Sequence, residues 1–301
     1  MIMSSQMSKI IYKVLKRSKL NTRLAIEIKN NQLEAHPQKK PSKHMMRTYH
    51  IETKTFFSRT VYYINLNNDL NQTIIFYMHG GAYVHGLSKM HYALFKKLIK
   101  YTQCVLVAPD YPLVPKASVD DIYLFLETSY LDLIKAHPKS KVILMGDSAG
   151  GGLALGLAMH LYKKHQIKDH QVMLLSPWLD ISMENPRIKE IEDQDPILNL
   201  ETLQCVGKMY ARDLNIKDER LSPIYGSFEC IQKIDLWTGT KDILYADALE
   251  LEEKLKEQKH KLKVYTYDDM LHTWMFFGLP ESKQSILEMI KVINHSKESS
   301  K

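Results

Sequence analysis

The chain has 301 residues, 45% of which are hydrophobic, and three cysteines that show no C-x-x-C spacing. This composition excludes a globally disordered protein and predicts neither a disulfide framework nor a zinc site. The net charge of +7 is uneven, because residues 1–60 hold 13 Lys and Arg against 3 Asp and Glu, while the rest of the chain is nearly neutral.

The basic N-terminal segment has two interpretations. A solvated helical face is the simpler one, since like charges on an exposed helix are common. The other is weak contact with an anionic membrane surface. We expect no nucleic-acid partner. The apolar runs are shorter than the roughly 20 residues that span a bilayer, and residues 1–20 lack the apolar core of a signal peptide. The sequence therefore predicts a cytoplasmic protein.

The first third of the chain is predicted to be helical and then extended. Residues 4–20 have the pattern of an amphipathic helix, with lysines on one face. The apolar face of this helix is predicted to hold Ile10, Ile11, Val14 and Leu15. A second helix is predicted around residues 21–33, followed by a polar linker over 35–43 and two antiparallel strands between 50 and 66.

From residue 73 onward, short apolar runs alternate with amphipathic helical segments. The predicted strands cover residues 74–78, 104–108, 141–145, 171–175, 233–237 and 262–267. The predicted helices cover residues 88–101, 119–136, 151–159, 200–212, 244–258 and 282–294. Residues 178–230 interrupt the alternation as an insertion, and the tail from Ser296 is predicted to be frayed. Such alternation predicts an α/β fold with a mostly parallel sheet and helices on both faces.

Ser148 is the candidate nucleophile. It lies in Gly146-Asp147-Ser148-Ala149-Gly150, between a predicted strand and a run of small residues that predicts a buried helix. Strand, G-x-S-x-G and helix are the layout of a nucleophile elbow. This tight turn lifts a weakly nucleophilic hydroxyl clear of the backbone, to where a base can reach it. Its two glycines remove side chains that would collide with the neighbouring strand and helix.

A second motif, His79-Gly80-Gly81-Ala82, follows the first strand of the alternation. Acyl transfer passes through a tetrahedral oxyanion, for which free backbone N–H groups are suitable donors. We assign the oxyanion hole to the amides of Gly80, Gly81 and Ala149. We expect His79 to support this loop by hydrogen bonding rather than to act as a base.

Asp242 and His272 are the candidate partners of Ser148. Asp242 lies on the loop that leaves the strand 233–237, at the carboxyl end where open α/β sheets place their sites. His272 follows the next strand. In these positions His272 would take the proton of Ser148, and Asp242 would hold the imidazole in the correct tautomer. The order Ser148, Asp242, His272 is that of α/β-hydrolases.

With these motifs in place, the chain resembles the hormone-sensitive-lipase-like family of α/β-hydrolase esterases. The residues that carry the resemblance are His79-Gly80-Gly81, Asp110-Tyr111 with Pro115, Gly146-Asp147-Ser148-Ala149-Gly150-Gly151, Ser176-Pro177-Trp178-Leu179-Asp180, Ser222-Pro223, Gly239 with Asp242, and His272. The chain departs from the family at Ala82, where a third glycine is usual, and at Pro112, where an arginine is usual. The first departure leaves open whether Ala82 joins the oxyanion hole.

The resemblance implies an α/β-hydrolase fold with an eight-stranded sheet. It implies a helical cap built from the basic segment of residues 1–48 and the insertion at about 180–215, on a hydrolase domain of residues 49–301. It also implies a serine esterase that acts on carboxylic esters of short to medium acyl chains through an acyl-enzyme, without metal or cofactor. An amidase or formamidase with the same triad, and a non-catalytic ligand-binding protein on this scaffold, are the alternatives.

Three aromatic residues lie in or beside the predicted catalytic loops. Tyr83, Trp178 and Trp274 are predicted to line the substrate pocket, with ordinary core packing as the alternative. The protein is expected to be a monomer or a homodimer.

Overall fold

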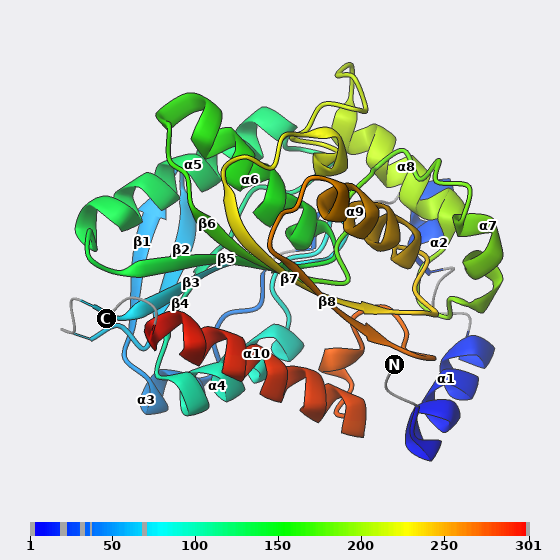
Figure 1. Ribbon diagram of the computed structural model, residues 1–301, viewed down its shortest axis with the longest axis horizontal. Coiled ribbons are helices and arrows are strands. Elements are labelled where there is room, and N and C mark those ends of the chain that lie inside the picture. Colours follow the sequence, from blue (N-terminus) through cyan, green and yellow to red (C-terminus); the bar gives the residue numbers. More distant parts are fainter. Residues whose placement is uncertain (1–3, 19–22, 31–33, 37, 68–70, 299–301) are drawn as a thin grey trace.

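The computed structural model describes residues 4–18, 23–30, 34–36, 38–67 and 71–298. Its centre is an eight-stranded sheet in the order β1-β2-β4-β3-β5-β6-β7-β8 (Figure 1). The strands are β1 (Ile51–Phe56), β2 (Arg59–Ile64), β3 (Thr73–Met78), β4 (Val105–Pro109), β5 (Lys141–Asp147), β6 (His170–Leu175), β7 (Ile231–Gly239) and β8 (Leu262–Tyr267). Only the β1–β2 and β2–β4 pairs are antiparallel, so the predicted α/β fold with a mostly parallel sheet is confirmed.

Helices cover both faces of the sheet (Figure 1). The helices on one face are α3 (Lys43–Thr48), α4 (Lys89–Thr102) and α10 (Pro280–Glu298), and those on the other are α5 (Val119–Ala136), α6 (Ala149–His165) and α9 (Tyr245–Glu257). Successive strand side chains point to opposite faces. Ile74 and Phe76 of β3 therefore pack in the core under α5 and α6, while Ile75 and Tyr77 pack in the core under α4 and α10.

The insertion between β6 and β7 contains short helical elements. These are α7 (Ile188–Ile191), η2 (Glu192–Gln194), α8 (Leu200–Ala211) and η3 (Pro223–Tyr225). The N-terminal helix α2 (Arg23–Lys29) lies against α8 (Figure 1). This contact joins the two segments that the sequence assigned to the cap.

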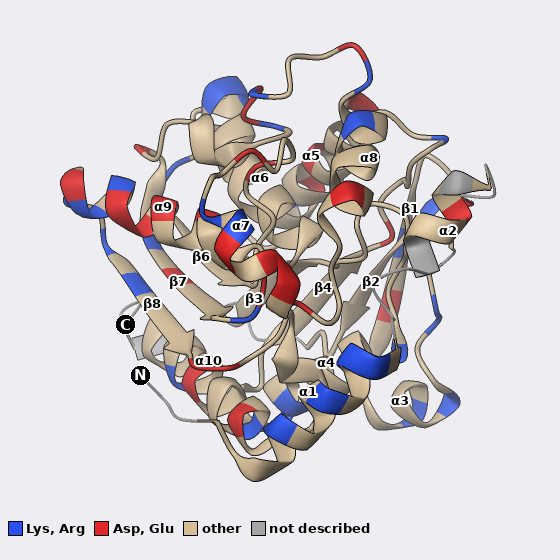
Figure 2. Ribbon diagram, turned by 90° about the vertical axis from the view of Figure 1, so that its right-hand side faces the viewer, with Lys and Arg blue, Asp and Glu red and all other residues tan. Residues whose placement is uncertain are grey.

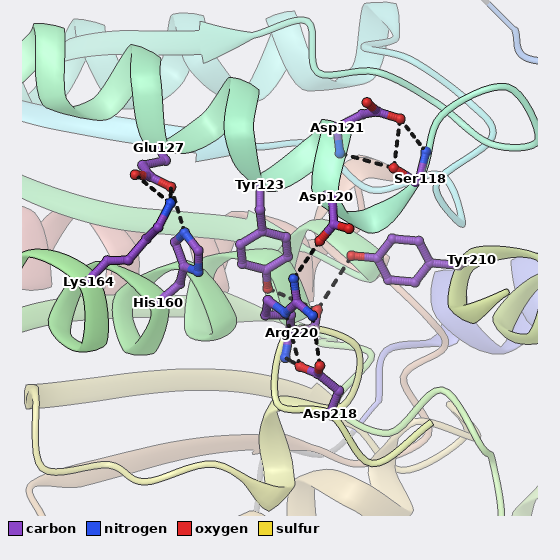
Figure 3. A network of polar contacts seen from close by, with 10 residues as sticks. All are labelled: Ser118, Asp120, Asp121, Tyr123, Glu127, His160, Lys164, Tyr210, Asp218 and Arg220. Carbon is purple, nitrogen blue, oxygen red and sulfur yellow. Dashed lines mark hydrogen bonds and ion pairs between the residues drawn. The ribbon is translucent and has the colours of Figure 1, made fainter. Parts of the chain in front are cut away.

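A polar network attaches the second half of the insertion to α5 (Figure 3). The guanidinium of Arg220 donates to Asp120 of α5 at 2.6 Å and to Asp218 at 2.8 Å. The Arg220 carbonyl accepts the hydroxyl of Tyr123 of α5 at 2.9 Å and that of Tyr210 of α8 at 3.4 Å. Charged and neutral hydrogen bonds thus hold the insertion at this end.

In helix α1 (Gln6–Ser18), the buried side differs from the apolar face that the sequence predicted. Ile10 and Val14 are 62% and 60% exposed, whereas Ile11 packs against the core under α10. The inward face carries Ser8 instead, whose hydroxyl donates to Glu281 at 2.6 Å. Hydrophobic periodicity identified the helix, but this polar contact decided which side is buried.

The fraying predicted from Ser296 is not found in the described residues. Ser296 is buried in α10, which continues to Glu298, and its hydroxyl donates to Gln171 at 2.6 Å; residues 299–301 lie outside the described part. The predicted linker runs beside the residues that follow the His79-Gly80-Gly81-Ala82 motif. The amides of His36 and Lys39 donate to the carbonyls of Val84 and Leu87 at 2.9 and 2.8 Å. Within the described residues, no helix is both long and apolar enough to cross a bilayer.

Candidate active site

Ser148 occupies the turn between β5 and α6. Its backbone has φ 53° and ψ −123°, a strained conformation for a residue with a side chain. The close packing around the turn excludes side chains at both flanking glycines. A Cβ at Gly146 would lie 2.1 Å from the carbonyl oxygen of Gly150, and a Cβ at Gly150 would lie 2.1 Å from that of Met78. This geometry is that of the nucleophile elbow expected from the sequence.

The elbow is held by β6 and the residues that follow it. The amide of Ser148 donates to the carbonyl of Leu175, and the Ser148 carbonyl accepts the amide of Trp178, both at 2.9 Å. The side chain caps no amide of α6, and its hydroxyl has no hydrogen-bond partner among the described residues. The hydroxyl is therefore available to donate its proton to a base and to approach a substrate.

Asp242 and His272 form a buried pair. The distance from His272 Nδ1 to Asp242 Oδ2 is 2.8 Å, while Asp242 Oδ1 accepts the amide of Leu244 at 3.0 Å. Burial lowers the pKa of His272, but the carboxylates of Asp242, Asp195 and Asp147 outweigh it, so that the net pKa is raised above 6.5. Because the Asp242 carboxylate accepts a hydrogen bond from Nδ1–H, this contact leaves Nε2 as the nitrogen that can take a proton.

Hydrogen bonds tie the loops that carry these residues. The amide of Asp269 donates to Thr240 Oγ1 at 2.9 Å, and the amide of Lys241 donates to the carbonyl of Met270 at 2.9 Å. The amide of Thr273 donates to the hydroxyl of Ser176 at 3.2 Å, next to the end of β6. The structure thus brings Ser148, Asp242 and His272 to the carboxyl ends of β5, β7 and β8, with the Asp242–His272 pair in direct contact.

The oxyanion loop differs from the prediction at Gly80. Its amide donates to Asp147 Oδ1 at 2.9 Å and is therefore occupied. Gly81 and Ala82 have φ angles of 118° and 51°, and their amides donate to no acceptor in the described part of the chain. The free amides of this loop are consequently those of Gly81 and Ala82, and Gly80 serves to anchor the loop.

His79 supports the same loop, as the sequence predicted. Its Nδ1–H donates to the carbonyl of Gly80 at 2.9 Å, and its ring stacks on Tyr111 with centroids 4.1 Å apart. Complete burial lowers the pKa of His79 to about 3, so the ring is neutral at physiological pH. A neutral ring with Nδ1 already engaged acts as a structural support.

Asp147, beside Ser148, is a residue of the candidate site that sequence reasoning missed. Besides the Gly80 amide, its carboxylate accepts the Tyr77 hydroxyl at 2.7 Å and lies 3.3 Å from His91 Nε2. Burial raises the pKa of Asp147, but His91 and the hydrogen bonds of Tyr77 and Gly80 outweigh it and lower the pKa overall. A charged Asp147 thus links the elbow to the oxyanion loop.

The three predicted substrate-binding aromatics are buried in the core. Tyr83 stacks on Tyr210 of α8 with centroids 3.9 Å apart, and the indole N–H of Trp178 donates to the Asp180 carbonyl at 2.9 Å. Trp274 packs on the opposite face of the sheet, against Tyr267. Because all three rings have almost no exposed surface, the structure favours the core alternative over a pocket lining.

This sheet topology, with a strained serine after β5 and a buried Asp–His pair after β7 and β8, defines the α/β-hydrolase class. The chain belongs to the α/β-hydrolase fold family, which it matches over residues 75–276.

Similar proteins have been named as esterases. An esterase of Acinetobacter venetianus is 30% identical over 223 residues, which cover 72% of this chain and 73% of the relative. An acetyl esterase of Salmonella schwarzengrund is 26% identical over 231 residues, covering 69% and 67%. A crystal structure of an esterase from the bacterial hormone-sensitive lipase family has the same fold, with a TM-score of 0.80, 22% identity and coverage of 97% and 99%. These findings confirm the predicted resemblance and place the chain among carboxylic ester hydrolases.

Proposed function

We propose that the protein is a serine esterase that cleaves carboxylic esters of short to medium acyl chains. The observation that carries this proposal is the 2.8 Å contact of Asp242 and His272 at the sheet edge where the strained elbow presents Ser148. The esterase names of the relatives support it.

In the proposed mechanism, Ser148 Oγ attacks the ester carbonyl carbon while His272 Nε2 takes the serine proton. The C–O bond to the alcohol then breaks, and His272 returns the proton to the leaving oxygen. Water attacks the resulting acyl-enzyme by the same route, which releases the acid and restores Ser148. Asp242 orients the imidazole and stabilises its protonated form in both halves.

We propose that the amides of Gly81, Ala82 and Ala149 hold the oxyanion. Ala149 is the first residue of α6, so its amide lies in the first turn, where N–H groups lack intrahelical acceptors. The Gly80 amide is excluded because Asp147 accepts it. Ala82 supplies only its backbone, which explains how an alanine serves where the family has a glycine.

The test is hydrolysis of a p-nitrophenyl ester series, from acetate to long acyl chains, together with matched amides. We expect turnover to peak at short or medium chains and Ser148→Ala to lower kcat/KM at least about a thousandfold. Ser129→Ala, at a buried serine on α5, is the matched control and should retain activity. Turnover of the amides alone would replace the esterase with an amidase, and activity unchanged in Ser148→Ala would refute the proposed nucleophile.

We also propose that α1, whose charged residues are all basic (Figure 2), makes weak contact with anionic membrane surfaces. Met7, Ile10 and Val14 form an exposed apolar stripe, beside which the exposed residues include Lys13 and Arg17. The helix contains no acidic residue. An apolar stripe bordered by cations is the pattern of helices that lie on anionic lipid. The cytoplasmic location and the choice between monomer and homodimer stay predictions.

Co-sedimentation with vesicles tests the membrane contact. We expect the protein to bind vesicles that contain phosphatidylserine better than pure phosphatidylcholine, and the double variant Ile10→Ser/Val14→Ser to lose most of this binding. Leu287→Ser, at an exposed leucine of α10, is the control and should bind as the wild type does. Equal binding by all three proteins would rule the contact out.

A further inference from the structure

Asp195 lies in the insertion, directly after η2, yet its side chain reaches the catalytic loops. The residue is completely buried. One carboxylate oxygen accepts the amides of Ile197 and Leu198 at 2.8 and 2.9 Å, which closes the turn that leads to α8. The other oxygen accepts the amide of Ile243 at 2.9 Å, across 48 positions of sequence. Ile243 is the residue that follows Asp242.

Through this hydrogen bond, Asp195 connects the insertion directly to the loop that carries Asp242. Asp242 Oδ1 accepts the amide of Leu244 on one side of Ile243, and Asp195 Oδ2 accepts the amide of Ile243 itself. Two carboxylates therefore hold consecutive amides of one short loop. Any shift of the insertion would move the loop that orients His272.

The charge at this position is unusual. Among the described residues, no lysine or arginine forms an ion pair with Asp195. Burying a carboxylate without a cation is costly, and a neutral side chain would also accept backbone amides. Among the largest electrostatic effects on Asp195, the charge of Asp242 opposes its ionisation and that of His272 favours it. Protonated His272 is thus an opposite charge that acts on Asp195.

We propose that Asp195 is a positioning residue for the triad. It fixes the loop that carries Asp242 to the insertion, and its negative charge stabilises the protonated form of His272. The proposal rests on the proposed function, since His272 must take a proton for this charge to matter. Asp195 does not touch the reacting atoms, and it acts through Asp242 and His272.

Asp195 and His272 each stabilise the charged form of the other. Burial and the charge of Asp242 raise the pKa of Asp195 overall, to about 7, although the amides of Leu198 and Ile243 and the charge of His272 act in the opposite direction. In return, the carboxylates of Asp242, Asp195 and Asp147 raise the pKa of His272 against the effect of burial. Proton transfer from Ser148 to His272 thus favours the ionised form of Asp195 at the moment when its charge is useful.

The experiment measures, as a function of pH, how fast an organophosphate reagent with a p-nitrophenyl leaving group modifies Ser148. Ser148 Oγ attacks the phosphorus, p-nitrophenolate leaves, and the serine proton passes to His272. This readout requires no knowledge of the natural ester. Modification of the wild type at Ser148, with none in Ser148→Ala, tests the proposed nucleophile separately from the role of Asp195.

Asp195→Asn removes the charge and keeps an acceptor oxygen. We expect the plateau rate to fall about tenfold and the acidic limb of the pH profile to move to lower pH, because a negative charge near His272 is lost. Asp247→Asn is the matched control: Asp247 is equally buried, and burial also raises its pKa, to about 7, but it is not among the groups that raise the pKa of His272. We expect this control to leave the limb in place.

Two outcomes would overturn the proposal. An Asp195→Asn enzyme with an unchanged acidic limb would reduce Asp195 to a structural contact, even if its rate falls. An equal shift in Asp247→Asn would show that the limb responds to any buried charge. Thermal unfolding of each variant guards against loss of fold, and Asp195→Ser provides the same measurement if the asparagine variant does not fold.

Discussion

Among the contacts that attach the insertion between β6 and β7 to the rest of the molecule, two use charge in opposite ways. At Arg220 the carboxylates of Asp120 and Asp218 each face the guanidinium, and the Asp120 side chain is 73% exposed (Figure 3). At Asp195 a buried carboxylate lies near a second one, Asp242, and has no lysine or arginine in an ion pair among the described residues.

This contrast separates the Arg220 contact, which attaches the insertion, from the Asp195 contact, which we propose also acts on the triad. Opposite charges near solvent stabilise a contact modestly and tolerate replacement. Like charges in a buried site destabilise the protein unless a third group gains from them, and they are concentrated at functional sites. His272 is that third group here, since both carboxylates raise its pKa. The two ends of the insertion should therefore respond differently to mutation.

The largest effect is expected at the catalytic end. Asp242→Asn should lower kcat/KM by at least about a thousandfold, because the imidazole loses both its orientation and the stabilisation of its protonated form. His272 must be neutral to act as base, so activity should rise with pH through its pKa, which is above 6.5 in the wild type. In the variant this acidic limb should move to lower pH. A pH series of p-nitrophenyl ester hydrolysis measures both changes.

An acidic limb that stays in place in Asp242→Asn would contradict the assignment of Asp242 as the group that raises the pKa of His272. The effect of Asp195→Asn should have the same sign and a smaller size. A larger shift in Asp195→Asn than in Asp242→Asn would exchange the roles of the two carboxylates.

The smallest effect is expected at the Arg220 end. Arg220→Gln removes both ion pairs and should lower the free energy of unfolding by about 1 kcal/mol, the size typical of partly exposed pairs. The acidic limb should not move, because Arg220 is not among the groups that shift the pKa of His272. Urea unfolding and the same pH series check the two parts. A displaced limb would mean that this end of the insertion also controls the triad.

Much of the fold was predictable because local patterns determined it. The predicted bounds of α5 and β8 agree with the structure at both ends, since capping, apolar periodicity and β-branched content all act within a few residues. Ser148, Asp242 and His272 could be proposed as site residues for a related reason: each follows a recognisable strand, and the carboxyl ends of parallel strands meet at one edge.

The missed features depend on contacts between distant parts of the chain. The Gly80 amide is occupied by a side chain 67 positions away. Asp195 has the local sequence of an ordinary turn before proline, and nothing nearby indicates its contact with Ile243. Ile10 and Ile11 are equally apolar, and contacts with distant residues, such as the bond of Ser8 to Glu281, distinguish the buried side of α1.

The docking of α1 has a consequence for the order in which the protein is completed. Ser8 and Ser4 bond to Glu281 and Asp269, which lie 273 and 265 positions further along the chain, and the ammonium group of Lys241 lies over the Tyr12 ring at 4.2 Å. The ribosome makes α1 before these partners. Helix α1 therefore cannot complete its docking until synthesis has passed Glu281, so the segment made early is among the last to reach its final place.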